Sequence, residues 1–282
     1  MTLEEALTLG VVQGLTEFLP ISSSAHLKMV PTLLGWNDPG PAFTAVVQLG
    51  TLVAVLIYFA GDIIKILGGW FSSLAQGRFA ANHEAKQAWM IAFSTIPIVT
   101  AGVLFKDNIE SNLRSLYFTA VMLIVVAWVM ALAEAYHYYL WRRDYAFKTL
   151  AEVKWWDGII IGLAQAVALI PGTSRSGATI SAGLFTGLDR STAARFSFLL
   201  SLPAIFAAGV YQLYSTWGEI RSNSDKTTML VTATIVAGIV GYASIAFLIG
   251  YLRTHSTGVF IAYRIIVGVV LLILLSFGVI KP

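Results

Sequence analysis

Residues 6–34 read ALTLGVVQGLTEFLPISSSAHLKMVPTLL, an apolar stretch that one proline and three serines interrupt near its middle. A membrane-spanning helix needs about 20 mostly apolar residues, because the hydrocarbon core is about 30 Å thick. The stretch is long enough, but a break at membrane depth is tolerated only where protein or a water-filled cavity surrounds it. We therefore predict a re-entrant pair of half-helices, which enters and leaves on one face of the membrane, rather than a kinked spanning helix.

A second stretch, residues 156–188, has the same organisation and is interrupted by PGTSRS at residues 171–176. The sequence GVVQ at residues 10–13 matches GLAQ at residues 162–165, and a proline follows each glutamine after six or seven residues. Serines and a second apolar half come after each proline. The two stretches therefore indicate an internal repeat.

Continuous apolar segments fill most of the remaining chain and are long enough to span a bilayer. They are residues 43–61, 88–105, 116–137, 194–214, 228–250 and 259–279. Each broken stretch with three spans forms one unit, and we place the units at residues 1–140 and 150–282 of a single membrane domain, 1–282. Because three is odd, the second unit is inverted, and in such repeats the broken half-helices meet near the midplane and form a site. The predicted fold is an all-α polytopic membrane protein with six transmembrane helices and two re-entrant helix–loop–helix pairs.

Composition supports a membrane protein. Of 282 residues, 57% are hydrophobic and 12% are charged, whereas soluble domains have roughly 25% charged residues. The mean hydropathy of +0.76 excludes an ordinary cytosolic globule, a disordered chain, a coiled coil and a basic nucleic-acid-binding face. The absence of cysteine excludes disulfides and thiolate chemistry. The first five residues are acidic where a signal peptide is basic, so we expect the first apolar segment to stay in the mature protein.

The basic residues of the loops predict the orientation. One face would carry Lys65, Arg78, Lys86, Arg142, Arg143, Lys148, Lys154, Arg190, Arg195 and Arg253, which makes ten. The other face would carry Lys28, Lys106, Arg114, Arg221, Lys226 and Lys281, which makes six, together with both termini. The excess of basic residues on cytoplasmic loops predicts that the first face is cytoplasmic and that both termini lie outside.

Ionisable side chains lie in or beside the two breaks, where their burial is costly and suggests function. They are Glu17, His26 and Arg175. Gln13 and Glu17 are four residues apart and project from one face of the first half-helix. Helical side chains lean towards the N-terminus, so we expect His26 to reach one of the hydroxyls in the first break.

The first break has the composition of an activated nucleophile. His26 follows Ser22 and Ser23 by four and three residues, and an imidazole beside a hydroxyl can take its proton while a carboxylate orients it or holds a metal. The alternative is that Ser22, Ser23 and Ser24 only cap the second half-helix and that His26 is a packing residue.

The second break, PGTSRSGAT at residues 171–179, combines glycines, hydroxyls and one arginine at the start of a half-helix. Free N–H groups and the positive end of the helix dipole form an anion site there, and the guanidinium fork matches phosphate oxygens. We expect a phosphate or diphosphate ligand. As alternatives, the glycines and serines serve only close helix packing, or Arg175 pairs with Glu17.

Four further polar residues are less informative. Gln48 and Gln165 lie within apolar stretches. The sequence leaves two equal alternatives for them, lining the same cavity or forming hydrogen bonds between helices. Arg264 and Glu134 lie near the ends of predicted spans, where we expect snorkelling or a structural ion pair.

The motifs QGLTEFLPISSSAH, residues 13–26, and PGTSRSGAT, residues 171–179, resemble those of the bacterial undecaprenyl-pyrophosphate phosphatases of the bacitracin-resistance type. The resemblance covers essentially the whole chain, including QLG at residues 48–50 and AYR at residues 262–264. It implies an enzyme of the bacterial cytoplasmic membrane, with its active site facing the periplasm. Such an enzyme hydrolyses a polyisoprenyl diphosphate, releases inorganic phosphate and regenerates the monophosphate carrier lipid of cell-wall synthesis.

The same resemblance implies roles for individual residues. Glu17 matches the essential acidic position, Ser23 the serine proposed as nucleophile, and His26 its partner. Arg175 matches the arginine that holds the diphosphate. The remaining predicted substrate contacts are Ser22, Ser24, Gln13, Gln48, Ser174, Ser176 and Thr179.

A divalent metal, Mg²⁺ or Ca²⁺, is also implied, with Glu17 and Gln13 as its predicted ligands. Gln13 departs from the pattern, because many relatives have Glu there. The implied partners are undecaprenyl diphosphate and membrane lipid, and no nucleic acid; a homodimer is left open.

The expected mechanism places the diphosphate between the two half-helix N-termini. Ser23, with His26 as its base, attacks the terminal phosphorus and forms a phosphoserine that water hydrolyses. Direct attack by metal-activated water is the competing route. A transporter or lipid flippase is the alternative from another class, because inverted repeats with broken helices also build transporters, and alternating access would need comparable cavities on both faces. A non-catalytic scaffold gives no reason for charged groups at two matching breaks.

Overall fold

The structure is a computed structural model that describes residues 1–105, 113, 115–222 and 224–281. Its helices are α1 (Leu3–Phe18), α2 (Ser23–Leu34), α3 (Gly40–Tyr58), α4 (Ala60–Ala75), α5 (His83–Leu104), α7 (Leu116–Trp141), the short 3-10 helix η2 (Leu150–Glu152), α8 (Trp155–Val167), α9 (Arg175–Phe185), α10 (Arg190–Ser222), α11 (Ser224–Leu252) and α12 (Gly258–Ser276). The described part of the chain has no β-sheet, and the predicted all-α class is confirmed.

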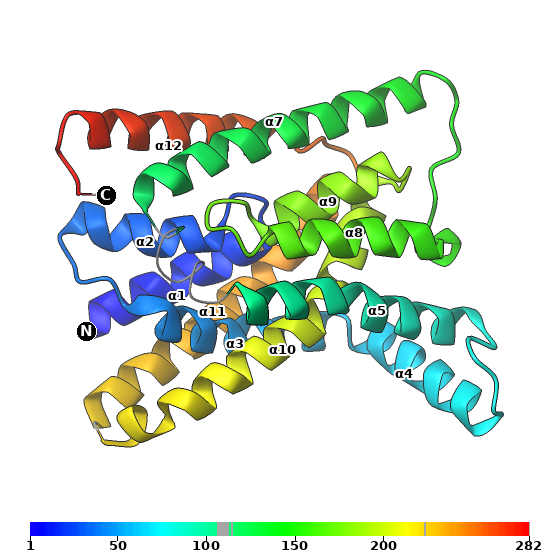
Figure 1. The fold of residues 1–282 in the computed structure, drawn as a ribbon, viewed down its shortest axis with the longest axis horizontal. Helices are drawn as coiled ribbons and strands as arrows, with labels where there is room; N and C mark the ends of the chain where they lie inside the picture. Colours follow the sequence, from blue (N-terminus) through cyan, green and yellow to red (C-terminus); the bar gives the residue numbers. More distant parts are fainter. Residues whose placement is uncertain (106–112, 114, 223, 282) are drawn as a thin grey trace.

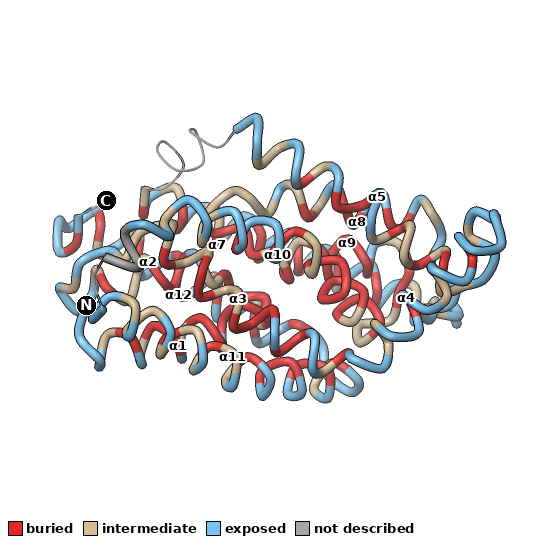
Figure 2. The backbone as a smooth tube through the Cα atoms, turned by 90° about the horizontal axis from the view of Figure 1, so that it is seen from below, coloured by how far each residue is buried: buried red, intermediate tan, exposed pale blue. Residues whose placement is uncertain are grey.

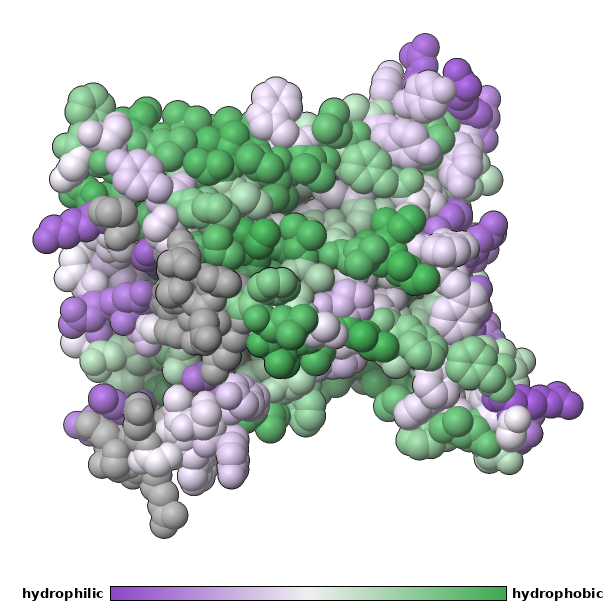
Figure 3. Space-filling view, viewed as in Figure 1, coloured by the Kyte–Doolittle hydropathy of each residue, from purple (hydrophilic) through white to green (hydrophobic). Residues whose placement is uncertain are grey.

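The helices make this a polytopic membrane protein. Within the described residues, α5, α7, α10, α11 and α12 are each long and apolar enough to cross a membrane, and the bent pair of α3 and α4 is a sixth candidate. Figure 3 shows an apolar surface across the middle of the molecule and hydrophilic residues gathered at its two ends. This distribution is the one that a bilayer requires of the surface in contact with lipid.

The span predicted at residues 43–61 differs in shape from the expectation. Helix α3 ends at Tyr58, and α4, a helix that was not predicted, follows it at 79°. Phe59 lies at the bend and is buried, with its ring centroid 6.3 Å from that of Phe198 on α10. Burial of this ring against α10 fixes the chain where it turns.

The two broken stretches approach each other from opposite ends of the molecule. Figure 1 shows α1 and α2 extending from the end that holds both termini, and α8 and α9 from the other end, with the two breaks adjacent in the middle. The backbone N–H of Gly172 donates to Ser24 Oγ at 3.4 Å, and Ser176 Oγ donates to the Leu19 carbonyl at 3.2 Å. The breaks therefore touch. The repeat units 1–140 and 150–282 and the re-entrant placement in the bilayer stay predictions.

Close helix packing holds α1 in place. Helix α11 lies against both α1 and α3, and Figure 2 shows the buried residues concentrated along such internal contacts. A Cβ atom at Gly14 of α1 would lie 2.8 Å from the Ala237 carbonyl oxygen, and one at Gly50 of α3 would lie 1.9 Å from that of Thr234. Glycine at these positions lets the backbones approach, and the C-terminal end of α1 is thereby fixed at the centre of the molecule.

Both termini lie at one end of the molecule (Figure 1). Figure 1 shows the connections α4–α5, α7–α8 and α9–α10 towards the opposite end and the α11–α12 connection nearer the middle; the larger group of basic residues was predicted on this side. Lys106 and Arg114, and the side chain of Arg221, lie outside the described part of the chain. Which end faces the cytoplasm stays a prediction.

Candidate active site at the two helix breaks

The two breaks end in the same unusual backbone conformation. Ser22, directly before α2, has φ 78° and ψ 98°, and Ser174, directly before α9, has φ 70° and ψ 117°. Positive φ in a non-glycine residue costs about 1–3 kcal/mol and persists only where the surroundings impose it. The turn at each serine brings the N-terminal ends of α2 and α9 to the centre of the molecule. Their free N–H groups and positive dipole ends favour an anion there.

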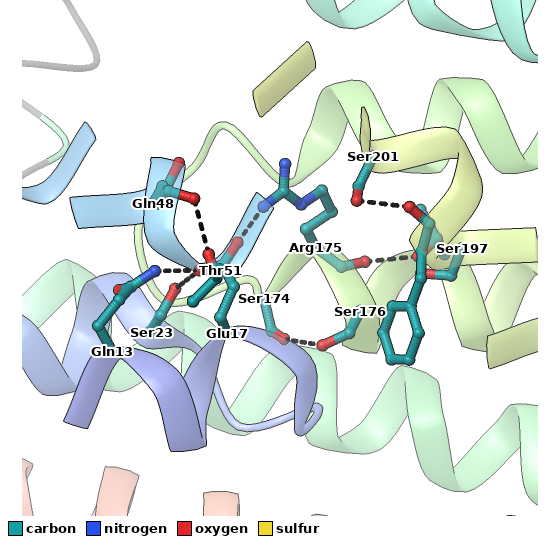
Figure 4. Close-up of polar contacts among 12 residues, drawn as sticks. Gln13, Glu17, Ser23, Gln48, Thr51, Ser174, Arg175, Ser176, Ser197 and Ser201 are labelled. Carbon is teal, nitrogen blue, oxygen red and sulfur yellow. Dashed lines mark hydrogen bonds and ion pairs between the residues drawn. The ribbon is translucent and has the colours of Figure 1, made fainter. Parts of the chain in front are cut away.

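Glu17 is the centre of the polar site (Figure 4). Its side chain is only 3% exposed, and its Oε2 accepts hydrogen bonds from Gln13 Nε2 and from Ser23 Oγ, each at 2.8 Å. Its Oε1 forms an ion pair with Nη2 of Arg175 from the second break. The fold thus brings together Gln13, Glu17, Ser23 and Arg175, and the Glu17–Arg175 pair that sequence reasoning left as an alternative is present.

His26 contacts neither of the predicted hydroxyls, so that expectation was wrong. Its Nδ1 lies 2.7 Å from the Ser22 carbonyl oxygen and its Nε2 lies 2.6 Å from the Tyr263 hydroxyl. A carbonyl only accepts, so Nδ1 is the donor and Nε2 accepts from Tyr263. The Ser23 hydroxyl turns instead to the carboxylate of Glu17, because a hydrogen bond to an ionised acceptor is the stronger one.

The hydroxyls of the two breaks form matching pairs. Ser22 Oγ lies 3.2 Å from Ser24 Oγ, and Ser174 Oγ lies 3.2 Å from Ser176 Oγ. Ser174 also accepts from the N–H of Gly177 at 3.1 Å and so caps α9. The capping role considered for the serines of the first break is not seen at Ser22, which makes no side-chain cap, whereas Ser174 in the second break does cap its helix.

Helix α10 supplies residues that sequence reasoning missed. Thr179 Oγ1 donates to the Arg175 carbonyl at 2.8 Å, and Ser197 Oγ lies 2.5 Å from the same Thr179 oxygen. A small cavity beside the site leaves about 10 Å³ for the centre of a water molecule; it is lined by Glu17, Phe18, Arg175, Ser176, Ser197, Phe198 and Ser201. The sequence did contain a feature that could have revealed these residues: Ser197 and Ser201 are four residues apart in the middle of an apolar span.

The two glutamines have different surroundings. Gln48, on α3, lies in the same region as Gln13 and Glu17 (Figure 4), and its carbonyl accepts from Thr51 Oγ1 at 2.9 Å. Gln165 is fully buried, and neither polar atom of its side chain has a hydrogen-bond partner among the described residues. Gln13 bonds to Glu17 four residues later, whereas the residue four after Gln165 is Leu169.

Glu134 forms the structural ion pair expected of it, with Nη2 of Arg190 at 2.6 Å. Arg264 does not behave as expected. It is fully buried within α12 and donates to backbone carbonyls of both breaks, so it neither snorkels nor forms an ion pair with a described residue. Carbonyls at a helix break lack helical donors, and the guanidinium satisfies them.

The oxygens around Glu17 suit a hard cation. Gln13 Oε1 is buried without a hydrogen-bond partner among the described residues, and it lies on the side chain that contacts Glu17. Mg²⁺ and Ca²⁺ take oxygen ligands, and Mg²⁺ is often held by one or two carboxylates together with substrate phosphates. The described residues contain no cluster of three or more His, Asp or Glu side chains. The residues therefore fit a cation shared with a bound phosphate better than a cage made of protein alone.

Fold and site together define a class: a polytopic α-helical membrane protein with a buried polar site at two facing helix breaks. Residues 6–270 match the family model described as Bacitracin resistance protein BacA, and the chain belongs to that family. It is 56% identical over 282 residues to a protein of Chlorobaculum parvum and 55% identical over 282 residues to one of Chlorobaculum tepidum, with both chains of each pair covered completely. A protein of Chlorobium limicola is 54% identical over 278 residues, which cover 99% of this chain and 98% of that one. All three relatives are named undecaprenyl-diphosphatase.

Proposed function

We propose that this protein is an undecaprenyl-diphosphate phosphatase that hydrolyses the lipid diphosphate to the monophosphate and inorganic phosphate. The observation that carries the proposal is the contact of the Ser23 hydroxyl with the Glu17 carboxylate, 2.8 Å away, beside Arg175. A hydroxyl, an acceptor for its proton and a guanidinium are the groups that transfer of a phosphoryl group requires. The three named relatives support the substrate.

Substrate binding exchanges one partner of Arg175. In the structure the guanidinium pairs with Glu17. The diphosphate binds at the N-terminal ends of α2 and α9, where N–H groups are free, and Arg175 turns from the carboxylate to the phosphate oxygens. The isoprenoid tail runs out between the helices into the lipid. This exchange keeps Arg175 paired at every stage and frees Oε1 of Glu17.

The phosphoryl transfer follows in two steps. Ser23 Oγ attacks the terminal phosphorus, its proton passes to Glu17, and the bond from that phosphorus to the bridging oxygen breaks, so that the lipid monophosphate leaves. Water then attacks the phosphoserine, returns a proton to Ser23 Oγ and releases inorganic phosphate, and the proton held by Glu17 passes to solvent. Glu17 replaces His26 as the proposed base, because the Ser23 hydroxyl points at Glu17 while both ring nitrogens of His26 are engaged.

A divalent cation, Mg²⁺ or Ca²⁺, belongs to the proposal, with Glu17 and Gln13 as its protein ligands. When bound, such an ion supplies neutralisation of phosphate charge. Gln13 then has two roles: its Nε2 donates a hydrogen bond to Glu17, and its buried Oε1 would bind the cation.

The transporter or flippase alternative is less well supported by the distribution of polar contacts. The end of the molecule opposite the termini is tied together by ion pairs; they are Arg190–Glu134 at 2.6 Å, Lys148–Asp157 at 2.9 Å and Arg195–Asp62 at 2.7 Å. Alternating access would have to break these contacts in each cycle, whereas hydrolysis at the two breaks leaves them intact. We also propose that this end is cytoplasmic, and that the site opens to the periplasm.

The test is phosphate release from a long-chain prenyl diphosphate by the purified full chain in detergent, with and without a chelator. Wild type should release phosphate, the chelator should abolish release, and Mg²⁺ or Ca²⁺ should restore it. Glu17→Ala should be inactive, and Glu4→Ala, which removes an exposed carboxylate from the same helix, is the matched control. Failure of wild type to release phosphate with metal present would favour the transporter instead.

A further inference from the structure

Arg264 is a fully buried arginine whose hydrogen bonds all go to main-chain carbonyls. The acceptors are the carbonyls of Pro20 at 3.2 Å, Gly172 at 2.8 Å, Thr173 at 3.1 Å, Leu123 at 3.1 Å and Met122 at 3.4 Å. No described carboxylate forms an ion pair with it. Burial of a charge without a counter-ion is costly even after the surroundings relax. The arrangement therefore calls for a specific use.

The carbonyls in the two breaks occupy equivalent positions. Pro20 lies two residues before Ser22, and Gly172 lies two residues before Ser174. These are the two serines with positive φ that begin the half-helices. One guanidinium therefore binds the same point of both breaks and supports the strained turn that follows each.

The Glu17 carboxylate and the Arg175 guanidinium lie equally far along the chain from the two anchor points, the carbonyls of Pro20 and Gly172. Glu17 is three residues before Pro20, and Arg175 is three residues after Gly172. Each of these two groups is therefore tied within three residues to a carbonyl that Arg264 binds. The neighbouring Tyr263 adds a further link from α12 through its hydrogen bond to His26.

Helix α12, which carries Arg264, is itself held in place, and Arg264 could not otherwise fix the positions of the two breaks. It packs along α7, and Nε of Arg264 donates to the Leu123 carbonyl within that helix. Nε, Nη1 and Nη2 are all directed at carbonyls. Every nitrogen of the Arg264 guanidinium thus donates to main chain, whereas Arg175 pairs with the carboxylate of Glu17.

We propose that Arg264 is a positioning residue, which sets the spacing of the two breaks and thereby aligns Ser23, Glu17 and Arg175 for phosphoryl transfer. The proposal rests on the proposed phosphatase function. A lysine carries the charge but only three N–H donors on one atom, so it cannot serve acceptors spread over two breaks and α7. A methionine fills much of the volume without any donor.

The experiment compares Arg264→Lys and Arg264→Met with wild type, using the full chain purified in detergent. Arg253→Lys, at an exposed position near the end of α11, is the matched control. The readouts are kcat and KM for phosphate release from a long-chain prenyl diphosphate. Because a misplacement of about 1 Å can cost roughly 100-fold in rate, Arg264→Met should lose about that factor in kcat with KM within about twofold of wild type. The kcat of Arg264→Lys should lie between those of wild type and Arg264→Met, and the kcat of Arg253→Lys should match that of wild type.

A second readout measures the spacing without reference to activity, and applies to any variant that is purified. The chain has no cysteine, so spin labels can be attached to Leu15→Cys on α1 and Leu163→Cys on α8, both exposed positions. The distribution of distances between the labels should be narrow in the wild-type and Arg253→Lys backgrounds and broader or shifted with Arg264→Met.

The outcomes separate the two proposals. Unchanged kcat and unchanged label distances in Arg264→Met would overturn the positioning role, as would full activity of Arg264→Lys. A raised KM with unchanged kcat would assign Arg264 to substrate binding and overturn it too. Absence of phosphate release from both wild type and Arg253→Lys would instead refute the phosphatase function, while the label distances would still report whether Arg264 sets the spacing.

Discussion

Replacement of Ser23 by alanine removes one oxygen atom from the centre of the site. Ser23 Oγ lies 2.8 Å from Oε2 of Glu17, which also accepts from Gln13 at 2.8 Å and pairs with Arg175 through its other oxygen. The carboxylate therefore keeps two of its three partners in Ser23→Ala. We expect the variant to fold, so that its activity reports on chemistry.

The size of the loss depends on which atom attacks the phosphorus. If water attacks directly, the variant loses one hydrogen bond to a charged group, worth about 1.5–3 kcal/mol, which is roughly 10- to 150-fold in rate. If Ser23 is the nucleophile, the covalent route disappears, and loss of a nucleophile in a serine hydrolase costs about 10⁶-fold in kcat. We expect a loss of at least about 10⁴-fold in Ser23→Ala, a value that the loss of one hydrogen bond does not reach.

The assay is phosphate release at saturating substrate, with Glu17→Ala as the background for contaminating phosphatase. Acid-quenched wild type should also carry a phosphoryl group on Ser23 by mass spectrometry, and Ser23→Ala should carry none. A purified Ser23→Ala that keeps its activity within about 150-fold of wild type would refute the covalent route and support attack by water.

Three further outcomes are expected. Arg175→Ala should raise KM and lower kcat together in the release assay, because the guanidinium contacts phosphate in ground and transition states; Arg175→Lys should recover only part of the loss, and an unchanged KM would contradict the contact. Gln13→Glu should lower the Mg²⁺ concentration needed for half-maximal activity and tighten Mg²⁺ binding measured by calorimetry, because it adds a carboxylate at the proposed ligand position; weaker binding would contradict that role. Gly50→Ala should lower the free energy of unfolding by about 1–3 kcal/mol, because its Cβ would lie 1.9 Å from the Thr234 carbonyl oxygen, whereas Gly68→Ala, with nothing within 4 Å, should not.

The breaks and the residues around Glu17 were predictable from sequence because local rules govern them. Proline and serines at membrane depth exclude a continuous helix, and the matching second stretch predicted that the breaks would meet. Once they meet, Glu17 and Arg175 have few other partners of opposite charge at that depth, and the ion pair follows. The helix spacing likewise placed Gln13 beside Glu17.

The partners of His26 and Arg264 were not predictable in the same way. Spacing gave the turn that His26 reaches, but not which acceptor on that turn it binds, which depends on the approach of Tyr263 from a helix more than 200 residues away. Arg264 was misjudged because its acceptors are main-chain carbonyls, which have no signature in the sequence. The bend at Phe59 was missed because hydropathy measures how apolar a segment is and not the direction in which it runs.

The two breaks share a backbone conformation and differ in their chemistry. Ser22 and Ser174 share a strained conformation, and each pairs with a serine two residues later. In this register the position of Ser23 in the first half is that of Arg175 in the second. The position of Glu17 is likewise that of Leu169.

The first break therefore supplies a hydroxyl and a carboxylate, and the second supplies a cation and an apolar residue. Two identical halves would place two carboxylates or two guanidinium groups against each other at membrane depth, where like charges repel strongly. The difference between the breaks avoids that repulsion, and in the proposed reaction it places the Ser23 hydroxyl and the Arg175 guanidinium beside the same phosphate. The proposed reaction thus depends on the contact between the breaks, and Arg264 donates hydrogen bonds to carbonyls on both sides of that contact.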